Sequence, residues 1–213
     1  MTNDEFSSQF DIYYNNVTSN AAPGLNEYEK SVFLTRASED IVIELYNGRS
    51  VPGVSFESTE ELRRYLSSLV KEYKVDLRGT SEYEVTLPED LWFITQETGI
   101  IKEDSCLNGK ELAVVPIRQD ELYRIRRNPF RNEDNRILRT DIDGKVILYS
   151  KHPISKYLIT YIKHPNPIIT ESLEGLDVTI ENKTESTTDI HPILHRAILE
   201  RAVALAKIAY IGK

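Results

Sequence analysis

The first 78 residues carry three apolar stripes with helical spacing. Each stripe follows a polar residue that has a glutamate three positions later, which is the pattern of a helix-capping box. These pairs are Thr2 with Glu5, Asn26 with Glu29, and Ser58 with Glu61. The stripes consist of Phe6, Phe10, Tyr13, Tyr14 and Val17, then Phe33, Ala37, Ile41 and Leu45, and then Leu62, Tyr65, Leu66, Leu69, Val70 and Tyr73. This spacing predicts three helices, of which the third runs through Tyr73.

The middle of the chain alternates between apolar and polar residues or carries short apolar runs, which favours strands. We expect strands at residues 83–87, 91–94, 112–115 and 157–162, with one short helix at residues 119–127. Residues 136–140 and 145–149 flank Asp143-Gly144, and Asp-Gly between two extended runs predicts a tight hairpin turn. The region is therefore predicted to be mainly antiparallel β structure.

A polar linker at residues 184–188 precedes the last apolar stripe. We expect a helix that starts near Asp189 and accepts Pro192 in its first turn. Because this helix is strongly apolar, we expect it to pack on the N-terminal helices. The candidate helix-packing residues are Leu194, Ala197, Ile198, Ala202, Leu205 and Ala209.

The predicted fold class is α+β. A helical bundle formed by the N-terminal helices and the C-terminal helix carries an inserted, mainly antiparallel β region. The predicted parts are residues 1–78 as the N-terminal helical part, residues 79–183 as the inserted β-rich part, and residues 184–213 as the C-terminal helix packing back on the helical part.

Composition and charge narrow the functional classes. The chain has 213 residues, a net charge of −8 and a single cysteine, Cys106, so no internal disulfide can form. Residues 1–117 hold 10 basic and 21 acidic residues, whereas residues 118–213 hold 16 and 13. This balance argues against a dedicated nucleic-acid binder and suits electrostatic contacts between copies. No apolar run reaches transmembrane length, so we expect no membrane partner and a soluble protein made in a cytoplasm.

One segment of the second half is rich in arginine and lacks lysine. It holds Arg118, Arg124, Arg126, Arg127, Arg131, Arg136 and Arg139. Arginine in preference to lysine suggests multidentate contacts to carboxylates or phosphates. Three interpretations compete, in descending order: pairing with acidic residues of neighbouring subunits, contact with DNA, and a solvated basic face.

No motif for catalysis or cofactor binding is present. The chain lacks a phosphate-binding glycine loop and a nucleophile elbow. His191 and His195 have the i, i+4 spacing of a metal pair, but the zincin glutamate and a third ligand are missing. Asp141 and Asp143 form a carboxylate pair that is better explained by the hairpin turn. We therefore predict no enzyme activity, no catalytic residue, no metal and no cofactor.

Four segments resemble the neck ring proteins of crAss-like tailed phages. They are residues 6–46, residues 114–131 with the sequence VVPIRQDELYRIRRNPFR, residues 157–168 with YLITYIKHPNPI, and the final helix with HPILHRAILERAVALAKIAYIG. The last segment is also similar to the closing helix of many tailed-phage adaptor proteins. The resemblance covers most of the chain and includes no catalytic signature.

The resemblance implies a structural protein of the virion neck, the connector between head and tail. Such proteins form rings, commonly dodecameric, that bind the portal protein and other neck or tail proteins, continue the DNA channel and help to retain the genome. Genomic DNA would pass nearby without specific contact. The alternatives are another virion structural protein of the tail or interior, a DNA-binding module using residues 124–139, and a small metal-dependent enzyme.

Overall fold

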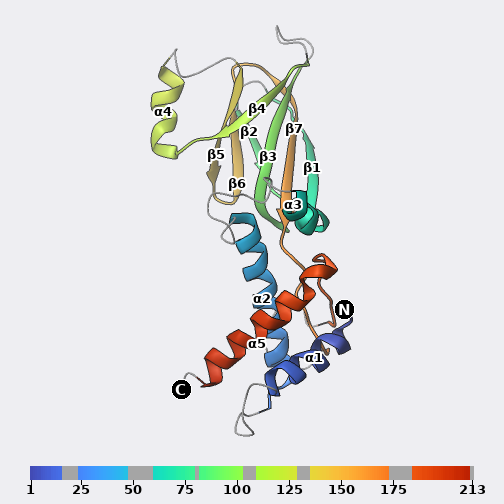
Figure 1. Cartoon of the computed structure of the whole chain (residues 1–213). Coiled ribbons are helices and arrows are strands. Elements are labelled where there is room, and N and C mark those ends of the chain that lie inside the picture. The colour runs from blue at the N-terminus through green and yellow to red at the C-terminus, as the bar shows by residue number, and fades with distance from the viewer. Residues whose placement is uncertain are drawn as a thin grey trace. The chain divides into compact units, whose positions relative to one another are not determined.

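The computed structural model describes residues 1–15, 24–47, 60–79, 82–102, 109–128, 135–172 and 184–211 (Figure 1). The chain forms two compact units. Met1–Leu69 together with His164–Lys213 make the first, called the helical unit here, and Val70–Lys163 make the second, called the sheet unit. The protein is therefore a mixed α+β protein.

The helical unit contains α1 (Asn3–Asn15), α2 (Glu27–Asn47), α3 (Glu60–Leu66) and α5 (His195–Ile211). Two capping boxes are confirmed. The Glu5 amide donates to the Thr2 hydroxyl at 3.3 Å, and the Thr2 amide donates to the Glu5 carboxylate at 3.0 Å. At α2, the Glu29 amide and the Asn26 side-chain oxygen are 2.8 Å apart. The predicted cap Ser58 lies outside the described residues.

The third predicted helix is wrong beyond its second turn. α3 ends at Leu66, a 3₁₀ turn follows at Ser67–Leu69, and strand β1 (Val70–Asp76) includes Tyr73. Every residue of β1 pairs with β7, from Val70 opposite Ile162 to Asp76 opposite Lys156. The apolar spacing of this segment favours a helix, but its backbone groups form hydrogen bonds with the distant strand β7 instead. Tertiary pairing therefore overrides the helical periodicity of the sequence.

The core of the helical unit lies between α1, α2 and α5. Phe6, Phe10 and Tyr14 of α1 are buried, and the Phe6 ring lies 5.3 Å from the His195 ring at the start of α5. α5 runs antiparallel to α2, because Arg201 pairs with Glu44 whereas Tyr210 bonds to Glu29 near the start of α2. The last helix begins later than predicted, since a 3₁₀ turn at Pro192–Leu194 precedes α5.

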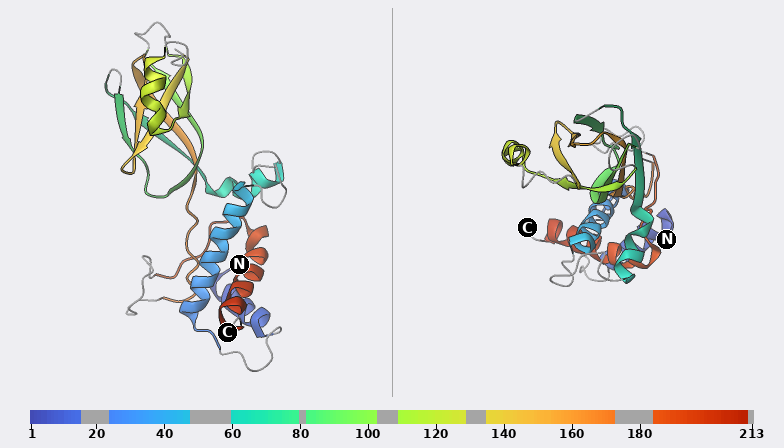
Figure 2. Two further views of the ribbon diagram at one scale, coloured as in Figure 1. Left: turned by 90° about the vertical axis from the view of Figure 1, so that its left-hand side faces the viewer. Right: turned by 90° about the horizontal axis from the view of Figure 1, so that it is seen from above.

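The sheet unit is a seven-stranded sheet with the order β1-β7-β3-β4-β5-β6-β2. The sheet is curled, as Figure 2 shows. Its other strands are β2 (Glu82–Thr86), β3 (Leu91–Ile101), β4 (Glu111–Pro116), β5 (Arg136–Ile142), β6 (Lys145–Tyr149) and β7 (Ile154–Lys163). All neighbours are antiparallel except β4 and β5, which are parallel and are joined through α4 (Gln119–Arg127). The predicted strands and the predicted helix are confirmed.

The hairpin between β5 and β6 is also confirmed. Ile142 pairs with Lys145 across a two-residue turn, in which Asp143 has φ 52° and Gly144 has φ 70°. Positive φ at both central residues is the geometry that Asp-Gly favours. Inside the curl, a single apolar cluster includes Tyr83, Ile137, Leu148 and Tyr157, and the Tyr83 hydroxyl accepts a hydrogen bond from the Ile154 amide at 2.8 Å.

Candidate interaction surfaces

α4 carries three of the seven predicted arginines. Asp120 and Glu121 lie in its first turn and Arg124, Arg126 and Arg127 in its last, so the charges oppose the helix dipole favourably at both ends. Ile125 is its only buried residue, and Tyr123 is 65% exposed. α4 therefore covers little of the sheet, beside which it lies in Figure 1. Its aromatic and basic side chains are exposed to solvent.

Side-chain contacts fix two of these arginines without burying them. Arg126 forms an ion pair with Glu82 of β2 at 2.9 Å, and its guanidinium lies 4.9 Å from the centroid of the Tyr149 ring. Arg127 stacks on the exposed Tyr123 ring at 4.8 Å. Arg124 is exposed, as is Arg118, which lies 3.6 Å from Asp120. Stacking orders an arginine while leaving its donors available to a partner.

Arg139 has a different environment. Its side chain is 12% exposed, donates to Glu97 at 2.6 Å and makes two bonds to the Asp141 carboxylate at 2.9 and 3.0 Å. Glu97 also accepts a hydrogen bond from the Tyr157 hydroxyl. Burial alone would lower the pKa of Arg139, but the bonds to Asp141 and the charge of Glu97 outweigh it and raise that pKa. This arginine links β3, β5 and β7 and is already neutralised.

Arg136 and Arg131 are the remaining two predicted arginines, and neither adds to the exposed group on α4. Arg136, at the start of β5, is half-buried and engaged in contacts of its own. Arg131 lies outside the described residues. The seven candidates are therefore not one surface: the exposed guanidinium groups gather on and beside α4, and Arg139 belongs to the interior of the sheet.

A groove on the sheet adjoins the Arg139 cluster. It has a volume of about 590 Å³ and is bounded by Trp92 and Phe93, whose rings stack 4.7 Å apart, and by Glu97, Arg139 and Asp141. Its walls combine aromatic surface with charges that already neutralise each other. Because Arg139 already pairs with both carboxylates, these charged groups are engaged in holding the sheet together.

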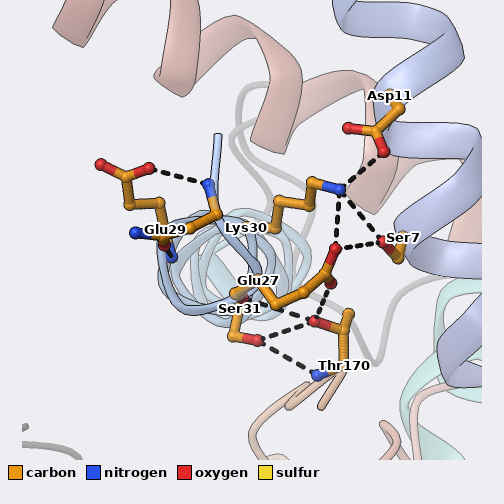
Figure 3. Close-up of polar contacts among 8 residues, drawn as sticks. Ser7, Asp11, Glu27, Glu29, Lys30, Ser31 and Thr170 are labelled. Carbon is orange, nitrogen blue, oxygen red and sulfur yellow. Dashed lines mark hydrogen bonds and ion pairs between the residues drawn. The ribbon is translucent and has the colours of Figure 1, made fainter. Parts of the chain in front are cut away.

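The helical unit holds a buried charge that the sequence did not single out. Lys30 is 4% exposed, and its ammonium bonds to Asp11 at 2.6 Å, to Glu27 at 2.8 Å and to the Ser7 hydroxyl at 3.1 Å (Figure 3). Burial alone would lower the pKa of Lys30, but these bonds to the two carboxylates raise it. The available signal in the sequence was the helical spacing of Lys30 to the apolar residues Leu34 and Ala37.

The same network joins residues 168–170, which follow the sheet unit in the sequence, to α2. The Thr170 hydroxyl donates to Glu27 at 2.7 Å, and the Thr170 amide donates to the Ser31 hydroxyl at 3.1 Å (Figure 3). Burial would raise the pKa of Glu27, but the bonds from Lys30, Thr170 and Ser7 lower it. Thr35 adds a second tie through the amide and carbonyl of Ile168. The network is a structural fastening of α1, α2 and residues 168–170.

The predicted packing residues of the last helix divide between two faces. Leu194, Ile198 and Ala202 are buried, Leu205 is half-buried, and Ala197 and Ala209 are exposed. Leu199, Val203 and Ala206 complete the buried side. The buried face is therefore rotated about the helix axis relative to the centre of the predicted stripe.

The histidine pair of the last helix is not arranged as a metal site. The Nδ1 atom of His195 lies 2.9 Å from the amino group of Met1, and its Nε2 atom lies 3.1 Å from the Ile190 carbonyl. His191 caps the 3₁₀ turn by accepting from the Ile193 amide at 3.4 Å. Burial lowers the pKa of His195. Across the ranges that the structure describes, no three His, Cys, Asp or Glu side chains group as metal ligands.

Asp141 and Asp143 have separate roles as well. Asp141 binds Arg139, and Asp143 occupies the left-handed position of the hairpin turn. Cys106 lies outside the described residues. Within the described part of the chain, no helix combines the length and apolar character that a membrane span requires.

The chain is similar to phage proteins along its whole length. Residues 1–213 match the model of a family described as phage tail ring protein 3/4. The chain is 45% identical to a protein of Bacteroides phage crAss001 named Ring protein 3, over 98% of this chain and 96% of that protein. It is 37% identical to another protein of the same phage, named Ring protein 4/5, over 100% of this chain and 94% of that protein.

Proposed function

Because this chain belongs to the phage tail ring protein 3/4 family, we propose that its copies form a ring in the neck of a tailed-phage particle, between portal and tail. The resemblance to ring proteins of crAss-like phages is confirmed by the full-length match. In this proposal the protein is a structural component of the virion that continues the DNA channel and helps to retain the genome. It carries no catalytic step and needs no cofactor.

The observation that carries the proposal is the 45% identity to Ring protein 3 over nearly the full length of both chains. Identity at this level over nearly the full length of both chains supports a shared fold and, in this proposal, a shared mode of assembly. The ring is dodecameric in this proposal, binds the portal and other neck or tail proteins, and is synthesised in the cytoplasm of the bacterial host. α1, α2 and α5 act together as a helical bundle that forms the body of the subunit.

The charges of the two units favour protein partners for the arginines. The sheet unit has as many basic as acidic residues, so the whole net charge of −8 belongs to the helical unit. A neutral sheet unit does not attract DNA as a basic domain does. We therefore assign Arg118, Arg124, Arg126 and Arg127, with the exposed Tyr123, to a contact with carboxylates of a neighbouring copy or of the portal.

Cryo-electron microscopy of the phage particle tests the proposal. Density that fits this chain as a symmetric ring at the portal–tail junction is expected, with α4 facing protein. A ring further down the tail would retain the family's assembly mode and overturn the neck position. Absence of the chain from every ring of the particle would overturn the function.

Variants test the assignment of α4 to the interface. Arg124→Glu combined with Arg127→Glu should reduce incorporation of a plasmid-supplied, tagged copy into particles, whereas Lys156→Glu, at another exposed position of the sheet unit, should not. Equal incorporation of both variants would remove α4 from the contact.

A further inference from the structure

α5 is more apolar than one buried face requires. Of its 17 residues, 12 are apolar, and they cover most of the helix circumference, whereas Arg196, Glu200 and Lys207 form a charged strip along one side. α1 and α2 cover only one side, which contains Ile198, Leu199, Ala202 and Val203. The apolar stripe is wider than the buried side of the helix, so its exposed part is expected to be covered by another surface.

Among the described residues of the helical unit, the uncovered side carries the most exposed large apolar side chains. Ile208 is 72% exposed, and Ile193, in the 3₁₀ turn before α5, is 60% exposed. Ala197 and Ala204 lie exposed between them at helical spacing. Two isoleucines separated by alanines form a surface that another helix can approach closely.

α1 offers a second uncovered face of opposite charge. Ile12, on the side of α1 away from its buried Phe6 and Phe10, is 58% exposed. α1 carries Asp4, Glu5 and Asp11 and no basic residue. α5 carries Arg196, Arg201 and Lys207 against one acid, Glu200. Asp11 is already paired with Lys30, Arg196 with Glu200 and Arg201 with Glu44. Asp4 and Glu5 on the side of Ile12 and Lys207 beside Ile208 are therefore the charges that complement each other here.

We propose that the outer face of α5 in one copy packs on the outer face of α1 in the next copy. This inference rests on the proposed ring function and names its subunit contact. The two faces are different and belong to one subunit, so each copy offers one of each and the contact is head-to-tail. Such contacts form a closed ring when the rotation between copies closes.

Glutamate substitutions at the two isoleucines test the contact in the full-length chain. Ile208→Glu disables the α5 face and Ile12→Glu disables the α1 face, while both side chains are exposed in the free subunit. We expect each variant to remain monomeric where the wild type forms rings, with association at least about tenfold weaker because a charge would be desolvated without a partner. Circular dichroism and the melting temperature should stay close to wild type.

Mixing the two variants distinguishes a head-to-tail contact from other arrangements. An Ile208→Glu copy retains its α1 face and an Ile12→Glu copy retains its α5 face, so the mixture should form a single type of contact. We expect a discrete one-to-one dimer by mass photometry. A mixture that remains monomeric while the wild type forms rings would overturn the proposal.

Ile142→Glu is the matched control, because Ile142 is also exposed, at 42%, but lies in the sheet unit. It should form rings and enter particles like the wild type. Ring formation or particle entry by Ile208→Glu at the level of this control would also overturn the contact. If the wild-type chain enters no ring in particles, the proposed function itself fails, and that result is separate from failure of the α5–α1 contact.

Discussion

Individual charged residues of similar type have opposite roles in this protein. Lys30 and Arg139 lie inside the two units, where each is paired with two carboxylates. Arg124 lies on the surface of α4. The sequence grouped Arg139 with Arg124 because both fall in one arginine-rich segment. Burial depends on which strands come together, so only the fold separates the structural arginine from the available one.

Replacing Arg139 should destabilise the isolated chain. Arg139→Met leaves Glu97, which is 6% exposed, without its cation, and we expect a loss of about 3 kcal/mol in the free energy of unfolding. Arg124→Met is the matched control and should change stability by less than about 0.5 kcal/mol. Urea titration measures both. Equal stability of the two variants would show that Glu97 does not need its partner.

Lys30→Met should lower stability by about 2 kcal/mol, because Glu27 and Asp11 lose their shared cation while remaining partly solvated. Arg36→Met, at an exposed position of the same helix, should have little effect. Urea unfolding midpoints compare the two. A midpoint for Lys30→Met equal to that of Arg36→Met would contradict the fastening role.

The pH dependence of stability follows from the Lys30 network. Glu27 has a lowered pKa, so its contribution is complete above its ordinary pKa and is lost as the pH falls from there through the lowered pKa. Lys30 has a raised pKa, so its contribution is lost only in strong alkali. The acid-induced loss should be smaller in Lys30→Met, because the lysine helps to lower the pKa of Glu27. Urea unfolding between pH 3 and 7 measures this difference.

Elements with local signals were predictable, whereas elements that depend on distant partners were not. The capping boxes, the Asp143-Gly144 hairpin and α4 are encoded within a few residues. β1 is not, because Val70 and Tyr73 continue the helical spacing of α3 and become a strand only by pairing with β7. The buried side of α5 was also shifted, since an apolar helix does not specify from its own sequence which side its neighbours cover.

The hairpin turn provides a test at the scale of elements. Gly144→Ala places a Cβ on a residue with φ 70°, and we expect a loss of about 1 kcal/mol in the free energy of unfolding. Gly24→Ala, which has open space around the added Cβ, should leave stability unchanged or slightly raised. Thermal melts of both variants would measure the difference. No difference between them would indicate a turn that relaxes without loss.

At the scale of the molecule, the two structural units do not coincide with the acidic and basic halves of the sequence. The acidic first half and basic second half become an acidic helical unit and a neutral sheet unit, because residues from both chain ends build the helical unit. Of the seven predicted arginines, Arg118, Arg124, Arg126 and Arg127 are exposed on or beside α4, and their role in an interface stays a prediction. Family membership could be inferred from the resemblance of four sequence segments. The candidate contact faces could be identified only once the structure showed which residues of α1 and α5 are buried.

The sheet unit should fold without the rest of the chain. Its apolar cluster is drawn entirely from residues 77–161. A fragment of residues 70–163 should therefore give a β-type circular dichroism spectrum and a cooperative melt. A scrambled sequence of the same composition serves as the control. An unfolded fragment would show that the sheet depends on the helical unit.

The fastening of Thr170 to α2 imposes an order on biosynthesis. A ribosome releases α1 and α2 first. Residues 168–170 and α5, whose side chains cover these two helices, are made last. The sheet lies between and is complete earlier, so it is free to fold while the two early helices still expose their apolar sides. Translation pauses after Lys163 would prolong that exposed state, and host chaperones are expected to bind the nascent chain most strongly in this interval.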